Sequence, residues 1–179
     1  MIYTIGHSTR TTDELIALLR ENGVGLLIDV RTVPRSRFNP QFNSDTLPGP
    51  LAEAGIGYRH IAALGGLRHR SKNAPPTRNT LWRNDAFRSY ADYASGYTFR
   101  AGLAELRHLA GEHSCAIMCA EAVWWRCHRR VVADYLLTQG ETVTHIMTPG
   151  RTEPARLTSG AAPQPDGTIL YPGPQGQLL

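Results

Sequence analysis

The sequence predicts a single α/β domain: an open, mostly parallel sheet of about five strands, helices on both faces, and a small C-terminal hairpin or tail. Three observations lead to this prediction. Short apolar or β-branched runs alternate along the chain with segments of helical spacing. The 179 residues, 41% of them hydrophobic, are enough to bury one core without disulfides or metals. The sequence contains no internal repeat, so that the alternation describes one domain.

Five short runs rich in β-branched, aromatic or apolar residues are expected to form the strands: residues 2–5, 24–30, 56–61, 114–120 and 141–147. The second run is almost continuously apolar, which is typical of a strand covered on both faces. Long connections separate the runs. We therefore expect parallel strands joined by right-handed crossovers.

Five segments are expected to be helical: residues 11–22, 44–54, 85–94, 100–110 and 125–138. The first begins at Thr11, which is followed by acidic residues, and ends at Asn22-Gly23; Gly140 ends the last. Prolines make residues 31–50 irregular. Residues 67–84 form a long basic loop, which is unusual inside a compact domain and often functional.

The C-terminal part of the chain is expected to differ from the rest. Residues 1–150 would form the core domain, and residues 151–179 a Pro- and Gly-rich extension. Pro165-Asp166-Gly167 predicts a turn between residues 155–157 and 168–171. The extension would then be a hairpin packed on the core or a tail.

Composition favours a cytoplasmic protein without a membrane segment. No apolar run is long enough to span a bilayer, and the N-terminus lacks the features of a signal peptide. Three cysteines, all between positions 115 and 127, do not make the framework of a secreted disulfide-rich domain. Arginine carries nearly all the positive charge. A GC-rich genome explains this arginine usage better than phosphate binding does, so a net charge of +4 is weak evidence for nucleic acid.

Polar residues lie at the carboxyl ends of the predicted strands, which is where open α/β sheets bind their ligands. Parallel strands would bring these residues to one edge: Gly6, His7, Ser8, Asp29, Arg31, Arg37, His60, Cys119, Glu121, Arg129 and His145. Each also has a structural explanation, such as a buried histidine that only forms hydrogen bonds or an arginine in a solvated loop. Their occurrence at five strand ends together favours a site.

The cysteine segment has several interpretations. Cys119 would end the fourth strand, and Cys127 would lie in the first turn of the next helix, where free amides favour a thiolate. Packing against the sheet explains Cys127 equally well. Cys119, Cys127 and His128 lack a recognised zinc spacing, and the two cysteines are not a C-x-x-C pair. A phosphate loop from Cys119 to Arg126 would contain no glycine.

Several blocks of residues, in this order, resemble the family catalogued as domain of unknown function 488. The blocks are TIGHS (4–8), DVR (29–31), YRH (58–60), LGG (64–66), MCAE (118–121), CHR (127–129) and VTHI (143–146). The resemblance covers residues 2–147 and implies that the blocks form one site, but it implies no particular chemistry. Residues 122–126 are more aromatic than is usual in this family. Their tryptophans would stack on a base or partner, or pack against the C-terminal tail.

We expect an enzyme that acts on a nucleotide, a nucleic acid or another phosphate-bearing substrate. The expected catalytic residues are Cys119, Glu121 and His7. The expected substrate contacts are Gly6, Ser8, Asp29, Arg31, Arg37, His60 and Arg129. Two alternatives stay open. One is a non-catalytic nucleic-acid-binding module that uses the basic loop with Trp82 and Trp124. The other is a metal site at Cys119, Cys127 and His128. The sequence does not define the cofactor, the substrate or the oligomeric state.

Overall fold

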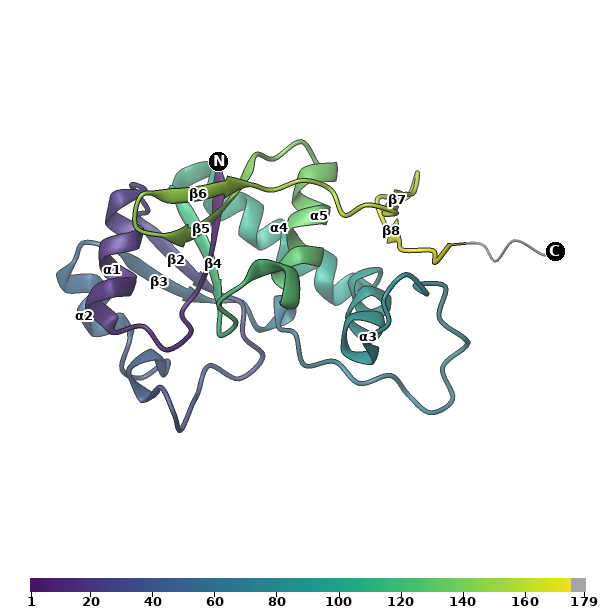
Figure 1. Cartoon of the computed structure of the whole chain (residues 1–179), viewed down its shortest axis with the longest axis horizontal. Coiled ribbons are helices and arrows are strands. Elements are labelled where there is room, and N and C mark those ends of the chain that lie inside the picture. Colours follow the sequence, from purple (N-terminus) through teal and green to yellow (C-terminus); the bar gives the residue numbers. More distant parts are fainter. Residues whose placement is uncertain (175–179) are drawn as a thin grey trace.

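The computed structural model describes residues 1–174 and contains a six-stranded sheet in the order β3-β2-β4-β1-β5-β6 (Figure 1). Its strands are β1 (Ile2–Gly6), β2 (Leu26–Asp29), β3 (Gly57–His60), β4 (Cys115–Cys119), β5 (Val143–Thr148) and β6 (Arg151–Pro154). The first five pair in parallel, and β6 pairs antiparallel with β5. The predicted α/β class and mostly parallel sheet are confirmed, and the sheet is one strand wider than predicted.

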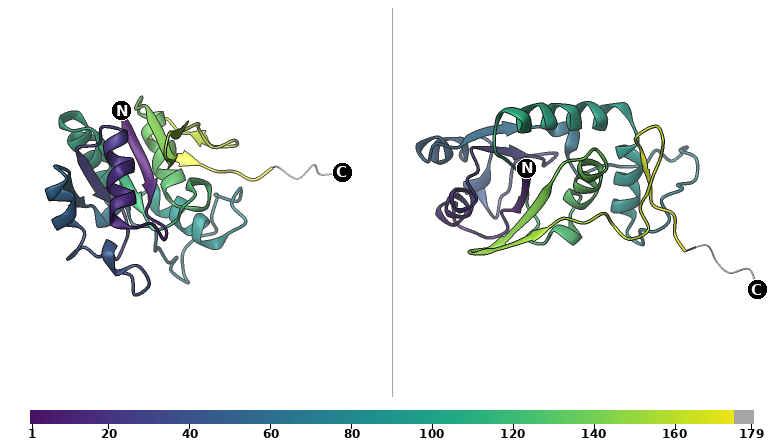
Figure 2. Two further views of the ribbon diagram at one scale, coloured as in Figure 1. Left: turned by 60° about the vertical axis from the view of Figure 1, so that its left-hand side comes forward. Right: turned by 90° about the horizontal axis from the view of Figure 1, so that it is seen from above.

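The helices cover both faces of the sheet, as predicted. They are α1 (Thr12–Glu21), α2 (Pro48–Glu53), α3 (Asp85–Ala94), α4 (Tyr97–Glu112) and α5 (Arg129–Thr138), with short 3₁₀ turns η1 (Pro40–Phe42), η2 (Ala62–Leu64) and η3 (Trp124–Arg126). Seen from above, α1 and α4 lie on opposite sides of the sheet (Figure 2). The α1 N-terminus is a capping box, in which the Glu14 amide donates to Thr11 Oγ1 and the Thr11 amide donates to the Glu14 carboxylate.

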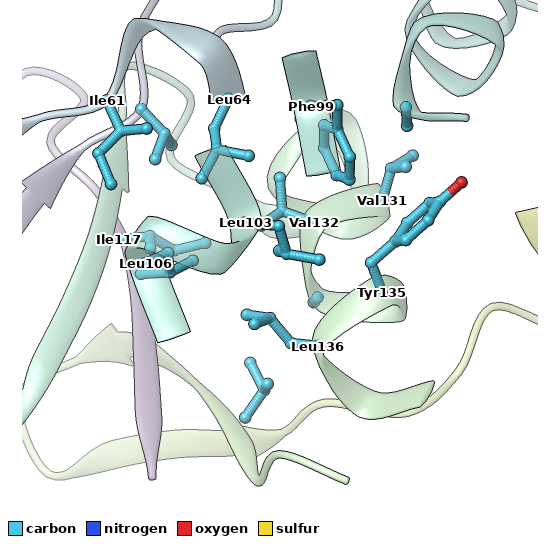
Figure 3. Close-up of a cluster of buried hydrophobic side chains, with 14 of the residues drawn as sticks. Ile61, Leu64, Phe99, Leu103, Leu106, Ile117, Val131, Val132, Tyr135 and Leu136 are labelled. Atoms are coloured by element: carbon cyan, nitrogen blue, oxygen red, sulfur yellow. The ribbon is translucent and has the colours of Figure 1, made fainter. Parts of the chain in front are cut away.

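Two apolar clusters hold the helices to the sheet because successive side chains of a strand point to opposite faces. In β4, Ile117 packs with α4 and α5, whereas Met118 packs on the side of α1 and α2. Figure 3 shows the first cluster, where side chains of α4 such as Leu103 meet those of α5 such as Val132. Burial of these side chains fixes α5, and therefore the segment that precedes it, against the end of β4.

The predicted helix over residues 125–138 is wrong at its N-terminal end. Trp124–Arg126 form the separate turn η3, Cys127 is extended (φ −122°, ψ 148°), and α5 begins at Arg129. Tertiary contacts override helical propensity here. The Arg129 guanidinium donates to the Glu121 carbonyl (2.7 Å), and the Arg129 amide donates to Cys127 Sγ (3.5 Å).

The C-terminal hairpin also differs from the prediction. Residues 151–154 pair with β5 as β6 after a tight turn in which Gly150 has a positive φ of 69°. Residue 169 then pairs with residue 163 rather than with residues 155–157, so that the hairpin is β7 (Ala162–Pro163) and β8 (Ile169–Leu170). The predicted turn at Asp166-Gly167 is present, with the Gly167 amide donating to Gln164 O.

The chain after β6 returns to the core beside α3 and α5. Ile169 and Tyr171 are buried, and Tyr171 Oη donates to the Asp134 carboxylate on α5 (2.9 Å). The Leu81 amide donates to Tyr171 O, which ties the long loop to this segment. Within residues 1–174, no helix combines the length and the hydrophobicity that crossing a membrane requires.

Candidate functional site

A cavity of about 410 Å³ opens at the carboxyl edge of the sheet, beside the end of β4. The residues predicted for the site that line it are His7, Arg31, Cys119, Glu121, Cys127 and His128. The predicted residues that do not line it are Gly6, Ser8, Asp29, Arg37, His60, Arg129 and His145. The sheet edge therefore brings six of the thirteen expected residues to the cavity, and most of the other seven contact the residues that line it.

Two thiols meet at the base of the cavity. Cys119 is the last residue of β4, paired in register with Gly6 of β1, and Cys127 lies two residues before the start of α5. Their Sγ atoms are 2.6 Å apart, and the two residues are only 2% and 3% exposed. The intervening segment leaves the sheet and returns, so residues eight apart in sequence form one pair.

The two thiols have different environments, which shift their pKa values in opposite directions. Burial, reinforced by the facing sulfur, raises the pKa of Cys119 well above its usual value. Burial also opposes ionisation of Cys127, but hydrogen bonding from Cys119 and the neighbouring His128 and Arg129 outweigh it and lower the pKa of Cys127. The environment therefore favours the ionisation of Cys127 over that of Cys119.

His128 is positioned to take the proton of Cys127. Its Nε2 donates to the Val30 carbonyl (2.9 Å), and its Nδ1 lies 3.5 Å from Cys127 Sγ. The bond to Val30 fixes the ring so that the free lone pair of Nδ1 faces the thiol. Gly66 packs against this ring so closely that a Cβ there would lie 2.5 Å from His128 Nδ1. The site therefore has a nucleophile in Cys127, an adjacent base in His128, and the Val30 carbonyl that orients this base.

Arg129 supplies a buried positive charge behind the thiols. It is 1% exposed, donates to Glu121 O (2.7 Å) and Thr4 Oγ1 (3.3 Å), and has no hydrogen-bond partner for Nε among the described residues. Within residues 1–174 no carboxylate forms an ion pair with it. A buried cation is costly without a counter-charge, and the ionisable groups that face this guanidinium are the two thiols.

Arg31 forms the opposite wall of the cavity and is held by Asp29. The fully buried Asp29 carboxylate accepts from Arg31 Nε (2.9 Å), Arg31 Nη2 (2.6 Å) and Tyr58 Oη (2.7 Å). Arg31 Nη2 also donates to Phe42 O, and His60 Nε2 donates to Arg31 O. This bidentate pair leaves Arg31 little charge for a ligand, so Asp29 and His60 are supports of the site.

His7 is a neutral member of the cavity wall. Burial lowers the pKa of His7 to about 4. Its Nδ1 donates to Ser8 O (2.9 Å), so Nε2 is the acceptor that faces Arg31 Nη1 (3.3 Å), and its ring stacks on Phe42. Ser8 adopts a left-handed conformation (φ 49°) to make this turn. The ring is therefore neutral above about pH 4, with Nε2 as an acceptor.

Gly6 lets the two strand ends approach each other. A Cβ at Gly6 would lie 1.8 Å from the Glu121 carbonyl oxygen. The His7 amide donates to Cys119 O and the Ser8 amide to Ala120 O, which extends the pairing of β1 and β4 beyond their ends. Gly6 therefore has a structural role, and the Glu121 side chain is left exposed at the mouth of the cavity.

His145 and the tryptophans lie apart from the cavity. Trp124 stacks on the His145 ring (centroids 4.5 Å apart, planes 8° apart), and its Nε1 donates to Glu153 of β6. His145 Nδ1 bonds Thr4 Oγ1 (2.7 Å), and burial lowers the pKa of His145 to about 4. Trp124 therefore packs against the sheet edge, while Trp125 is 44% exposed.

Most of the outer lip of the cavity was not predicted from the sequence. It contains Thr32, Val33, Arg35, Ser36, Gly66, Leu67, Asn84, Ala86, Phe87, Tyr90, Ala120 and Arg126. Gly66 lies in the predicted LGG block at 64–66, and the length of the loop at 67–84 could have pointed to part of the rest. Phe87 and Tyr90 could not be found in this way, because their pattern is that of an ordinary amphipathic helix.

The three residues predicted as possible metal ligands are not grouped with further ligand side chains in the part of the chain that the structure describes. Among residues 1–174 no group of three or more His, Cys, Asp or Glu side chains is placed to hold a metal ion. His128 already uses Nε2 on a backbone carbonyl, and Cys119 and Cys127 face each other. Cys119, Cys127 and His128 therefore make a thiol pair with an adjacent base.

Comparison with known proteins adds a family but no chemistry. No curated protein and no solved structure matches the chain. The family model described as "Domain of unknown function DUF488" matches residues 11–136, a span that includes the Asp29–Arg31 pair and both thiols. The resemblance seen in the sequence is thereby confirmed, and the chain belongs to the DUF488 family.

Proposed function

We propose that this chain is an enzyme that uses Cys127 as a nucleophile on a phosphate-bearing substrate, either a nucleotide or a nucleic acid. One observation carries the proposal: the guanidinium of Arg129 is buried behind the thiol pair and has no carboxylate partner within residues 1–174. A structural cysteine needs no such cation. A thiolate kept ionised for reaction does.

The first step is ionisation of Cys127. Its proton passes to Nδ1 of His128, 3.5 Å away, while Nε2–H of the same ring stays bonded to Val30 O. Cys119 stays protonated and its S–H group forms a hydrogen bond to the thiolate. This hydrogen bond lowers the free-energy cost of the buried charge. The thiolate then forms a bond to the electrophilic atom of the substrate as the bond from that atom to the leaving group breaks, and the leaving group takes the proton from His128. Water then cleaves the bond between sulfur and the substrate fragment and returns the free thiol.

The mouth of the cavity offers one further carboxylate. The Glu121 side chain is exposed there, and its backbone is held by Arg129. In this position its side chain is within reach of both solvent and a bound substrate. Cys119 and His7, which the sequence suggested as catalytic, take supporting roles as hydrogen-bond donor and neutral wall.

The substrate's anionic group would be held at the lip rather than at the base. Arg31 is committed to Asp29, and Arg129 is committed to Glu121 O and the thiols. Arg126 and Arg35 line the cavity with exposed side chains, and Arg126 has no ion pair within the described residues. An arginine fork with free donors is the group that binds phosphate oxygens best.

The test is a panel of nucleoside mono-, di- and triphosphates and short oligonucleotides, screened by thermal shift and then for product formation. A ligand that binds the native state raises the melting temperature. We expect at least one member to be turned over by the wild type, and Cys127→Ser to bind it with a similar shift but without turnover. Acid quenching should trap the substrate fragment on Cys127, seen by peptide mass spectrometry. Undiminished turnover in Cys127→Ser would refute the proposal.

A further inference from the structure

The positive charge of the chain is concentrated in one segment beside the thiol cavity. Residues 68–88 hold six of the 19 cationic residues and one of the 15 acidic residues. The segment therefore carries a formal charge of +5, more than the +4 of the whole chain, and the remaining residues together carry −1. Arginine usage set by genome composition would spread the charge along the chain, so it does not explain this concentration.

Half of these cations have no partner in the fold. Arg68 is held over the Tyr93 ring and donates to two carbonyls, Arg70 pairs with Asp92 (2.8 Å), and Arg88 pairs with Asp85. The other three are exposed and form no ion pair with residues 1–174: Lys72, Arg78 and Arg83. Their charges are available to a ligand.

Two cavities lie along this segment. Leu67, directly before it, lines both the thiol cavity and a second cavity of about 730 Å³, which is also lined by Arg68, His69, Arg70 and Arg78. The loop then runs around α3 (Figure 1) and returns to the thiol cavity at Asn84 and Phe87. The cationic surface of the segment therefore begins next to the thiol lip at Leu67, and one of its free cations, Arg78, lines the second cavity.

We propose that this surface binds the backbone of a single nucleic-acid strand and leads one nucleotide of it into the thiol cavity. The surface is longer than one phosphate requires, and its free cations recur along an extended segment, as a ligand with a charge at every link demands. Arginine forks match phosphate oxygens. The half-buried ring of Phe87 at the cavity lip offers an aromatic face on which a base can stack.

This inference names the substrate class of the proposed function and rests on it only for the chemistry, because strand binding does not need the thiol.

The test is fluorescence anisotropy with labelled 12-nucleotide single strands of DNA and RNA at several salt concentrations. The variant is Lys72→Ala/Arg78→Ala/Arg83→Ala. The control is Arg20→Ala/Arg107→Ala/Arg156→Ala, which removes the same formal charge from exposed positions outside the segment. The melting temperature of each variant is measured to check that it folds.

We expect the wild type to bind the strand more weakly as salt rises and the loop variant to lose at least tenfold in affinity. If each lost cation contacts one phosphate, the slope of log K against log salt should become shallower by about two, since each contact contributes about 0.7 on a single strand. The control should bind like the wild type. Equal losses in both variants would mean that only net charge matters, and would overturn the inference.

Two further arms separate this inference from its rivals. A glutamate-rich peptide of equal charge should bind at least tenfold more weakly than the strand; equal binding would overturn the assignment to nucleic acid. Cys127→Ser should bind the strand like the wild type. If Cys127→Ser keeps turnover, the nucleophile proposal fails while the strand site stands. If the loop variant binds like the wild type, the strand site fails whatever the thiol does.

Discussion

Replacing Cys119 with alanine tests whether this thiol keeps Cys127 ionised. The two Sγ atoms are 2.6 Å apart, and Cys119 S–H is the nearest donor to the thiolate. A hydrogen bond to a charged group contributes about 1.5–3 kcal/mol. Its loss should raise the pKa of Cys127, and the proton affinity of the thiolate should rise by about tenfold to a hundredfold. Cys119→Ser, which retains a donor, should show a smaller change.

The measurement is the pH profile of iodoacetamide alkylation at Cys127, read by peptide mass spectrometry. Cys127 lines the cavity, through which the reagent reaches it, whereas burial raises the pKa of Cys115 to about 11 and leaves it unreactive. Cys115→Ala is the matched control, since it removes a buried thiol from the same face of β4 without touching the pair. A midpoint that stays in place or falls in Cys119→Ala would refute the reasoning.

Three other predictions follow from the same geometry. Asp29→Asn should lower the free energy of unfolding in urea by about 3 kcal/mol, because it leaves a buried arginine without its carboxylate, whereas Glu105→Gln in an exposed pair should cost about 1 kcal/mol or less. Hydrogen peroxide should oxidise Cys119 and Cys127 to a disulfide, while the two thiol hydrogens and the peroxide leave as two water molecules. The intact mass of the protein should fall by the mass of the two lost hydrogens, and dithiothreitol should restore the original mass. Burial lowers the pKa of His145 to about 4, below its value in the unfolded chain, so the unfolded state binds the proton first. Stability should fall as pH drops from 6.5 to 4, by about 2–3 kcal/mol from this residue, and His145→Asn should flatten the profile. An equal profile in that variant would contradict the assignment.

Much of the sheet was predictable because its signals are local. The apolar run that contains Leu26–Asp29 is buried on both faces, and the Thr11–Glu14 capping box forms as its residues predict. The rule that ligands meet the carboxyl ends of parallel strands placed His7, Arg31 and Cys119 at one edge. Each of these inferences depends on residues close in sequence.

Other features depend on contacts that no local pattern encodes. The sequence predicted neither β6 nor the start of α5 at Arg129. In both places the chain follows pairing or hydrogen bonding with a distant segment. The sequence proposed Arg129 as a substrate contact only because arginine is a residue type that binds anions. Its burial behind the thiols is a property of packing between α5, β1 and the loop after β4.

The segment from Cys119 to Arg129 shows where the two kinds of information divide. By itself, the sequence determined the fold class, the family and the edge of the sheet at which the two cysteines lie. Only the tertiary structure decided that the thiols face each other at 2.6 Å, that His128 faces Cys127, and that the buried Arg129 has no other anion among residues 1–174. The reason is physical. Ionisation depends on burial and on the charges within a few ångströms, and those neighbours come from strands and loops far apart in the chain.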